Sequence, residues 1–394
     1  SVILIYRAND ISIKKEFFIS GSFNQFPDVE FPVLLQEGVT VIEERQNPFE
    51  LETLPLVDAQ KLTGSIEKSL VLTTAATSNN ELTTNYNVGG GNYDENLVYV
   101  NGFLVYRPFL TRSGQQEGMS FIHSALVESV RFSAGGFDAQ YGDKLSSVLD
   151  ITYKTPKTFK ASLMASLLGA EAHLEQGIGD RFNYIVGARY RSNGYLLNAL
   201  PTQGSYNPVF TDAQISTNLK ITENLTWSTL LHYSSNNYRF SPETSETDFG
   251  TANEAYSFRI YFDGQEQTKF ETMMGGVSLK WKASEKTDLD FYATAFQTTE
   301  REYFDIQGQY FINELETDPS KEEYGDSIAV LGIGTFLNHA RNKLDATIIN
   351  IYHNGKHEFF NGFTDQARLR YRNHHMKWGL SFQMDQFNDV LSEW

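Results

Sequence analysis

The side chains of this sequence that could perform chemistry are its histidines, its many carboxylates and one run of glycines. His353 and His357 have the i, i+4 spacing of a zinc pair on a helix. The Asn-Gly between them favours a turn, in which two imidazoles with this spacing do not converge. His374 and His375 are adjacent and would point to opposite faces of a strand. The histidines therefore predict no metal site.

The carboxylates and glycines do not form a recognisable catalytic or ligand-binding pattern either. Glu314, Glu316 and Asp318 are typical of a solvated acidic loop, and no spacing matches a calcium loop. The glycines at 89 to 91 are not followed by Lys-Ser or Lys-Thr and a helix, as a phosphate-binding loop requires. No Ser, His and Asp group suggests a triad, and there is no cysteine. We therefore predict that the protein is not an enzyme and has no cofactor.

The composition indicates a membrane protein built of strands. The net charge of -17 disfavours nucleic acid as a partner, because a phosphate backbone would be repelled. Aromatic residues make up 14% of the chain, which suits rings placed at two membrane interfaces. No stretch reaches the roughly 18 apolar residues of a spanning helix. Any membrane crossing must therefore be made by a closed set of strands.

After Pro156 the hydrophobic pattern has a period of two, which predicts strands with one apolar and one hydrated face. Four runs show this pattern, with mainly apolar side chains at every second position. These positions are Phe182, Tyr184, Val186, Ala188 and Tyr190 in the first run, Ala213, Ile215, Thr217, Leu219 and Ile221 in the second, Val277, Leu279 and Trp281 in the third, and Met376, Trp378, Leu380, Phe382 and Met384 in the fourth. We expect Ala213, Ile215, Leu219, Val277, Leu279 and Trp281 to face lipid. The connections at 179–181, 222–224 and 283–287 are short, whereas 192–212, 235–267 and 300–330 are long and polar. This asymmetry is typical of an outer-membrane barrel.

Four segments are expected along the chain. Residues 1–38 resemble the end of a small β-domain of the carboxypeptidase-regulatory-like kind, and residues 39–56 are typical of a linker. Residues 57–156 mix a short helix with strands and predict a compact α+β unit, in which Asn101 and Gly102 favour a type I′ hairpin turn. Residues 157–394 are the first part of the barrel.

The runs "YNVGGGNYDENLVYVNG" and "AQYGDKLSSVLDITYKTP" resemble the plug domain of TonB-dependent outer-membrane receptors, in the form common in Bacteroidetes. The resemblance implies an all-β transmembrane barrel of about 22 antiparallel strands with an α+β plug in its lumen. We therefore expect strands beyond those of this sequence. The plug motif would comprise Gly89, Gly90, Gly91, Asn101, Gly102, Tyr141 and Gly142. The family usually has Arg-Gly-Gly where this chain has three glycines, so Gly89 replaces an arginine.

The resemblance also implies a function and partners. The protein would lie in the cell outer membrane, in contact with its lipid, and import a scarce solute with energy from the TonB complex. The segment Val39, Thr40, Val41 and Ile42 is where the TonB-contacting strand would fall, although these residues equally suit the end of the preceding β-domain. Aromatic residues of the long loops are candidate ligand contacts: Tyr195, Tyr206, Tyr256, Tyr261 and Phe262.

An alternative is kept open. A receptor-like barrel can serve as a structural subunit of a larger outer-membrane assembly, for protein export or for handling a surface lipoprotein, and the altered glycine turn favours this reading. The sequence does not identify the solute.

Overall fold

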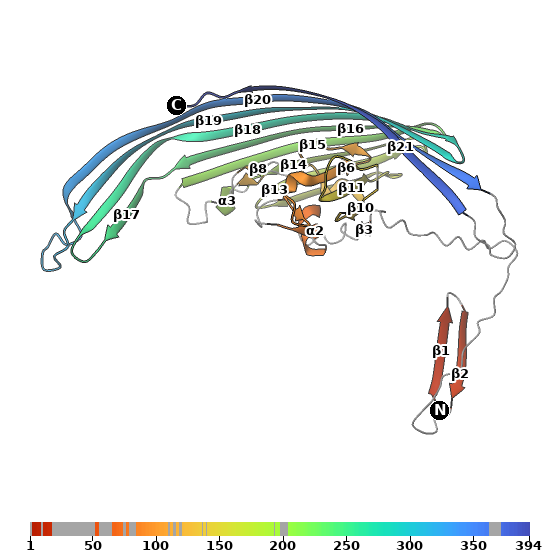
Figure 1. Cartoon of the computed structure of the whole chain (residues 1–394), viewed down its shortest axis with the longest axis horizontal. Helices are drawn as coiled ribbons and strands as arrows, with labels where there is room; N and C mark the ends of the chain where they lie inside the picture. Colours follow the sequence, from red (N-terminus) through yellow and green to blue (C-terminus); the bar gives the residue numbers. More distant parts are fainter. Residues whose placement is uncertain are drawn as a thin grey trace. The chain divides into compact units, whose positions relative to one another are not determined.

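The structure, a computed structural model, describes residues 2–8, 11–17, 52–54, 65–73, 76–78, 84–108, 111–112, 116–117, 120–135, 137–138, 140–192, 194–197, 204–361 and 372–394. The chain divides into two compact units, Ser1–Asn47 and Pro48–Trp394 (Figure 1). The predicted TonB-contacting residues Val39, Thr40, Val41 and Ile42 lie outside the described residues.

The described residues of the first unit, 2–8 and 11–17, form an antiparallel strand pair. β1 (Val2–Ala8) pairs with β2 (Ile11–Phe17), from Val2 opposite Phe17 to Ala8 opposite Ile11. Their β-branched and aromatic residues favour a strand. The boundary at residue 38 stays a prediction.

The second unit begins with a small α+β domain, here called the plug. Its five-stranded sheet has the order β3 (Glu52–Leu54), β10 (Val127–Ser133), β11 (Ser147–Tyr153), β6 (Asn96–Val100) and β7 (Phe103–Leu104). β11 and β6 are parallel, and the other neighbours are antiparallel. Its described residues also form helix α2 (Ile66–Thr73) and the 3-10 turns η1 (Tyr93–Glu95) and η2 (Ser124–Leu126). Two short antiparallel pairs lie beside them: β4 (Ala76–Thr77) with β5 (Asn87–Val88), and β8 (Thr111–Arg112) with β9 (Gln116–Glu117).

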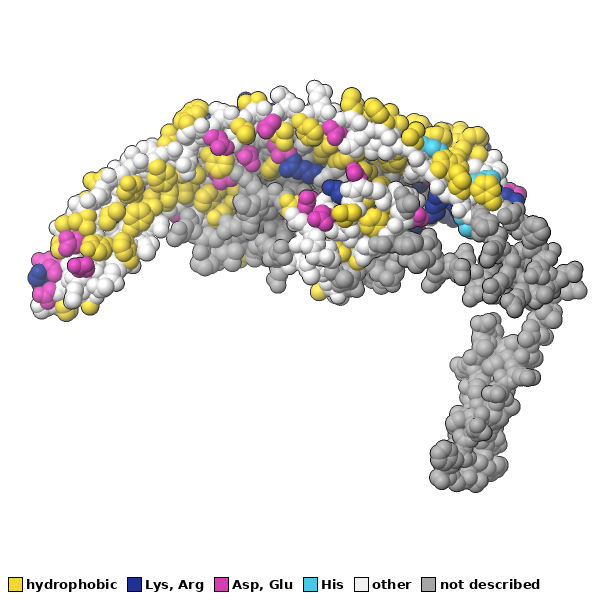
Figure 2. Space-filling model, viewed as in Figure 1, with side chains coloured by type: hydrophobic (Ala, Val, Ile, Leu, Met, Phe, Trp, Pro, Cys, Tyr) yellow, Lys and Arg dark blue, Asp and Glu magenta, His cyan; other side chains and the backbone are white. Residues whose placement is uncertain are grey.

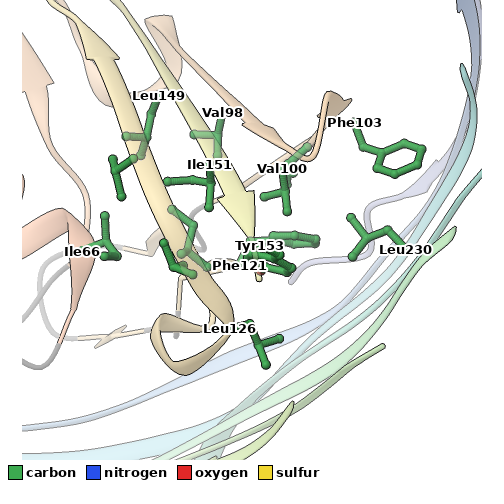
Figure 3. Packing of buried hydrophobic residues seen from close by; sticks show 14 of the residues in the cluster. Ile66, Val98, Val100, Phe103, Phe121, Leu126, Leu149, Ile151, Tyr153 and Leu230 are labelled. Atoms are coloured by element: carbon green, nitrogen blue, oxygen red, sulfur yellow. The ribbon is translucent and has the colours of Figure 1, made fainter. Parts of the chain in front are cut away.

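A hydrophobic core holds the plug together. Ile66 and Leu70 of α2 pack against the sheet residues Val100, Leu149 and Ile151, all of which are fully buried (Figure 3). Burying each such side chain contributes about 1.5–3 kcal/mol. Between β6 and β7, Asn101 and Gly102 have φ angles of 53° and 86°, as a type I′ turn requires. The predicted hairpin is therefore present.

The rest of the unit is one antiparallel sheet of ten strands, here called the wall. Its order is β12 (Lys160–Ser166), β13 (Gly169–Ile178), β14 (Phe182–Arg191), β15 (Gly204–Thr222), β16 (Leu225–Pro242), β18 (Ala255–Ser284), β19 (Thr287–Leu315), β20 (Ser327–Asn361) and β21 (Arg372–Val390), with β17 (Ser245–Gly250) paired to β18. A single-turn helix, α3 (Gly194–Leu197), precedes β15. The sheet is strongly curved, and the plug elements lie on its concave side (Figure 1). The predicted fold class, an antiparallel β-barrel wall with an α+β plug, is confirmed.

The long connections were predicted wrongly as loops. β18 and β19 have 30 and 29 residues, and β20 has 35, so most of 235–267 and 300–330 is strand. These outward strand ends carry apolar side chains at both parities, as at Ile260, Tyr261 and Phe262 of β18, together with many charged ones. The period-two alternation that identifies a strand in lipid is therefore absent there. The short turns lie where they were predicted, since β13 ends at Ile178 and β14 begins at Phe182.

The predicted turn at Asn354-Gly355 was also wrong. His353 and His357 both lie on β20, where backbone pairing with β19 continues through both residues. The His353 ring stacks on Phe291 at 4.5 Å, and His357 Nδ1 lies 2.8 Å from Thr287 Oγ1. Across the described part of the chain, no group of three or more histidine and carboxylate side chains is placed to hold a metal.

The convex face of the wall is apolar in a band, as the period of two predicted. Asp212, Gln214 and Ser216 of β15 are buried on the concave side, whereas Ile215 and Leu219 are each 40% exposed on the other. The exposed apolar residues of this convex parity continue across the sheet as Ile215, Leu219, Ile221, Leu231, Tyr233, Met273, Trp281, Phe291, Ile351, Met376, Leu380, Phe382 and Met384 (Figure 2). On β18 the band from Met273 to Trp281 is close to the roughly 9–11 residues that a strand needs to cross a bilayer.

Ion pairs mark the outward limit of this band. On the same convex parity, Lys269 pairs with Glu271 at 2.9 Å and Arg301 with Asp345 at 2.9 Å. Charged side chains are costly in the hydrocarbon layer, so these pairs belong outside it. Among the described residues, no helix is long and apolar enough to cross a membrane.

The convex face gives a first prediction. Val277→Arg, at the centre of the band on β18, is expected to destabilise the membrane-inserted protein by about 2–4 kcal/mol, because a charge at mid-bilayer is poorly solvated. Gln267→Arg is the control, since it has the same parity on the same strand but lies beyond the ion pairs. Unfolding by urea in phospholipid vesicles measures both variants. Equal losses would show that the band does not contact lipid.

Candidate functional site

The plug is seated on the concave face of the wall through apolar and polar contacts. The buried core of the plug continues into Ile185, Leu230 and Tyr292 of the wall. Among the polar contacts, one arginine reaches two carbonyls of the plug. Arg189 of β14 donates through Nε to Asp212 Oδ1 at 2.9 Å, and its Nη2 is also paired with the Asp212 carboxylate. Nη1 donates to the carbonyl of Ile122 at 2.7 Å and Nη2 to that of Ser120 at 2.8 Å. The guanidinium thus fixes the plug segment 120–122 to two strands of the wall.

Several further side chains join plug to wall. Asn101 Nδ2 donates to Ser216 Oγ at 3.3 Å, and Tyr153 donates to Gln214 Oε1 at 2.7 Å. Tyr352 of β20 donates to the carbonyl of Gly102 at 2.6 Å. Next to it, Asn350 Nδ2 donates to the Tyr106 hydroxyl at 2.9 Å. A contact surface held by hydrogen bonds can separate and reform with less cost than an apolar core, because water satisfies the freed groups.

Glycines of the wall allow close approach of plug side chains. A Cβ at Gly187 would lie 2.6 Å from His123 Cδ2, and one at Gly276 would lie 2.8 Å from Phe103 Cδ1. Burial and the neighbouring Arg189 charge lower the pKa of His123 to about 3, so its ring is neutral at physiological pH. The wall can accept this ring only where it has no side chain of its own.

These glycines give a second prediction. Gly187→Ala is expected to weaken the seating of the plug by about 1–3 kcal/mol, because the new methyl overlaps the His123 ring. Gly275→Ala is the matched control, since its Cβ would face the convex side and meet only Leu231 Cδ2 at 3.6 Å. The rate of proteolysis of the plug in the folded protein reports the effect. Equal protection of the two variants would contradict the close contact.

A pocket lies where the plug meets the wall. It is lined by Tyr106, Arg107, Pro108, Ser120, Phe121, Asp212, His232, Ser234, Asn236, Thr272 and Phe296. Along β15, its residue Asp212 lies beyond Gln214 and Ser216 in the direction of the long strand ends. The pocket therefore occupies the side of the plug that faces the projecting strands.

Two plug segments form the floor of this pocket. The Phe121 ring lies 4.4 Å from that of His232. Arg107 has a φ angle of 51°, lies 5.4 Å over the Phe270 ring and is ion-paired with Glu300. A positive φ in a residue other than glycine is costly and is frequent at ligand sites.

Helix α2 contacts the floor of the pocket through a side-chain hydrogen bond. Ser120, which lines the pocket, donates to the buried carboxylate of Glu67 on α2, and the Ile122 amide donates to Ser120 Oγ at 3.0 Å. Burial raises the pKa of Glu67 above its usual value, against the opposing effect of the Ser120 hydrogen bond. One hydroxyl therefore connects the pocket floor to the first helix described in the plug.

The residues of the predicted plug motif are spread over three turns. Gly89 and Gly90 have φ angles of 61° and 82° in an exposed turn, where the Gly91 amide donates to the Val88 carbonyl at 3.0 Å. A Cβ at Gly91 would overlap Ser146. Tyr141 is buried beside the exposed Gly142 and donates to Asp150 at 3.0 Å. None of these residues lines the pocket, and their functional role stays a prediction.

The five predicted ligand-facing aromatic residues lie outside the pocket as well. Tyr195 is 75% exposed on α3. The other four are on strands rather than loops: Tyr206 packs on Phe240 at 4.5 Å, Tyr256 on Phe249, Tyr261 on Phe311 and Phe262 on Phe336. Their role as ligand contacts remains untested.

The sequence reasoning missed the pocket residues. His232, Ser234 and Asn236 alternate with apolar or small residues on β16, so parity alone places them inside the wall. That signal was available in the sequence. The contact between β16 and the plug segment around Phe121 could not be predicted from the sequence, because the two segments are more than a hundred residues apart in the chain.

Comparison with known proteins gives structural likeness only. No family model matches the chain, and no curated protein sequence matches it. Among solved structures it is similar to the siderophore receptor PirA from Pseudomonas aeruginosa, with 10% identity, a TM-score of 0.36, and coverage of 81% of this chain and 63% of that one. It is also similar to the outer membrane transporter YddB from Escherichia coli, with 11% identity, a TM-score of 0.34, and coverage of 83% and 57%.

A third similar structure is BauA, the ferric preacinetobactin receptor from Acinetobacter baumannii, with 10% identity, a TM-score of 0.33, and coverage of 78% and 55%. The chain therefore spans less than two thirds of the length of each of these proteins.

Proposed function

We propose that this protein is a TonB-dependent receptor of the cell outer membrane, which imports a scarce solute through a plugged β-barrel. The single observation that carries the proposal is the α+β plug seated on the concave face of a wall whose convex face carries an apolar band (Figure 1). A solute that arrives from the projecting strand ends meets the plug, and it can pass inward only if the plug moves.

The contacts between plug and wall set what this movement requires. Arg189, Asn101 and Tyr352 hold the plug by hydrogen bonds, and apolar side chains of the wall take part in its buried core. A pulling force would therefore have to break these hydrogen bonds and separate the wall side chains from the core. The apolar convex band supports the membrane location, because it would be costly in water and is stable in lipid.

The test is uptake with and without the energy-coupling protein. Cells that lack the TonB complex should lose the growth phenotype that depends on this protein, while the barrel remains in the outer membrane at normal amount. A deletion of residues 39–42 should have the same effect, since the predicted TonB-contacting strand falls there. Unchanged growth in both strains would reject energised transport.

The alternative is a structural subunit for protein export or for handling a surface lipoprotein. It is favoured by the exposed position of Gly89, where an added Cβ would meet no described residue within 4 Å. Purification in mild detergent separates the two readings. A stable complex with other outer-membrane subunits, together with no dependence on TonB, would support the structural role.

We also propose that residues 1–38, 39–56, 57–156 and 157–394 are the end of a β-domain, a linker, the plug and the first part of the barrel. Among the described residues, β12 and β21 each pair with one strand, and unpaired backbone edges are not tolerated in lipid. Further strands should therefore close the wall. The mass of the protein particle in detergent is a direct measure: a particle made of one 44.7 kDa polypeptide alone would contradict this prediction.

A further inference from the structure

The convex face of the wall carries a row of basic side chains just outward of its apolar band. Lys269 of β18, Arg301 of β19 and Lys343 of β20 are register partners on three adjacent strands (Figure 1). In the next row outward on the same parity lie Arg239 of β16 and Arg341 of β20. These five side chains are here called the basic strip: Arg239, Lys269, Arg301, Arg341 and Lys343.

The basic strip differs in charge from the surfaces on both sides of it. On β18, the convex positions from Met273 to Trp281 carry no charge. Residues 243–266 and 306–326, which lie further outward on β17 to β19 and in their connections, contain 12 acidic and two basic side chains. The whole chain has a net charge of -17. Cations are therefore collected at one level, between an apolar band and an acidic outer region.

Carboxylates neutralise only part of the strip. Three of its cations have such a partner: Lys269 with Glu271 at 2.9 Å, Arg301 with Asp345 at 2.9 Å, and Arg341 with Asp305 at 2.7 Å. Arg239 and Lys343 are exposed, and among the described residues neither forms an ion pair. Basic side chains that lie directly opposite one another on adjacent strands repel each other. The strip therefore has an excess of positive charge that an external anion can neutralise.

The two paired arginines are held in place beside these free cations. Both oxygens of Asp345 accept from Arg301 Nη2, at 2.9 Å and 3.2 Å. Arg341 lies 5.3 Å over the Tyr303 ring, and its Nη2 donates to both oxygens of Asp305, at 2.8 Å and 2.7 Å. Each guanidinium remains partly exposed. Ordered guanidinium groups next to free ammonium groups are well suited to phosphate oxygens.

The strip lies at the height of lipid headgroups. Lys269 is four residues outward of Met273, the outermost apolar residue of the band on β18, which is about 13 Å along a strand. For a strand tilted by about 45°, this corresponds to roughly 9 Å along the membrane normal. The headgroup layer adds roughly 5–8 Å to each side of the hydrocarbon core, and long basic side chains can reach back toward it. The convex cations can therefore contact headgroups of the outward leaflet.

We propose that the basic strip binds the phosphate groups of a lipid in the outward leaflet of the membrane, while the acyl chains of that lipid lie along the apolar band. A lipid is favoured over a soluble phosphate compound because the cations continue directly from the lipid-facing band. The strip is three strand spacings wide, about 14 Å, which suits a headgroup with more than one phosphate. The inference concerns the lipid around the wall and does not depend on transport.

The test is equilibrium binding of fluorescently labelled lipids to the purified full chain in a neutral detergent. The probes are diphosphoryl lipid A, its monophosphoryl form and phosphatidylcholine, which has no net charge. The diphosphoryl lipid should bind at least about tenfold more tightly than phosphatidylcholine, because each cation near an anionic headgroup adds affinity. A rise from roughly 50 mM to 500 mM NaCl should remove most of this preference, since salt screens exposed charges. Equal affinities for charged and uncharged lipids would overturn the inference.

Variants connect the binding to the basic strip. Arg239→Gln/Lys343→Gln removes the two unbalanced charges and should weaken binding of the diphosphoryl lipid by about tenfold. Arg181→Gln/Lys220→Gln is the matched control, because it removes two exposed cations at the inward end of the wall, and binding should not change. Arg239→Lys/Lys343→Arg keeps both charges and should bind as the unaltered chain does. Equal affinities of the two glutamine variants would place the lipid elsewhere.

Inorganic phosphate distinguishes the lipid from a free anion. Added in large excess, it should leave the diphosphoryl lipid bound, because the acyl chains on the apolar band contribute affinity that a free ion lacks. Displacement of the lipid by phosphate in the unaltered chain, with phosphate binding lost in Arg239→Gln/Lys343→Gln, would show a site for soluble anions and reject the lipid.

Discussion

Arg189→Met should release the plug from the wall. The free energy that holds the plug against the wall should fall by about 3–5 kcal/mol. The substitution removes the donor to the Ser120 and Ile122 carbonyls and leaves the Asp212 carboxylate, 2% exposed, without its counter-charge. Breaking a buried ion pair from one side is costly because the remaining charge is neither paired nor hydrated. The measurement is the rate at which a protease cuts the plug in otherwise folded protein.

Two controls separate this effect from a general loss of stability. The double variant Arg189→Met/Asp212→Leu removes both charges and should recover a large part of the loss. Arg301→Met breaks the pair with Asp345 on the convex face, where the carboxylate is 42% exposed, and should cost less than about 1 kcal/mol. If proteolysis of the plug were equally fast in Arg189→Met and Arg301→Met, Arg189 would not hold the plug against the wall.

Locking the plug to the wall should abolish uptake altogether. The chain has no cysteine, so the pair Asn101→Cys and Ser216→Cys introduces the only two thiols. Asn101 Nδ2 and Ser216 Oγ are 3.3 Å apart, which a short thiol-reactive linker spans. If the plug must move for the solute to pass, cells with the linked protein should take up none, and each single variant should transport normally after the same treatment.

The same experiment distinguishes transport from a structural role. In a structural subunit of a larger assembly the plug only has to occupy the lumen and does not have to move. The linked protein would therefore still support the assembly. A reducible linker provides the internal control: uptake should return when the bridge is cleaved. Normal uptake by the fully linked protein would contradict the moving plug.

The sequence by itself determined which side of each wall strand faces which medium. Side chains alternate along a strand, so the apolar parity of Ile215, Leu219 and Trp281 predicted the convex face without knowledge of the neighbouring strands. The Asn101-Gly102 turn was determined in the same local way, because a type I′ turn needs two positive φ angles. These properties depend on residues close together in the chain.

The extent of the strands was not determined locally. The ends of β18, β19 and β20 were predicted as loops because apolar and polar side chains do not alternate there with a period of two. Their backbone hydrogen bonds come from strand partners, and a strand outside lipid needs no such alternation. The same reason explains why His353 and His357 lie on a strand and not beside a turn. Backbone pairing with β19 continues through Asn354-Gly355 and outweighs the tendency of that dipeptide to form a turn.

Only the tertiary structure decided the candidate site. It brings Phe121 of the plug onto His232 of β16, and it seats His123 in the space left by Gly187. These contacts depend on how a separately folded plug is placed against a sheet whose strands follow it in the chain. Such placement results from shape and from buried hydrogen bonds between distant residues, and neither leaves a pattern in the local sequence.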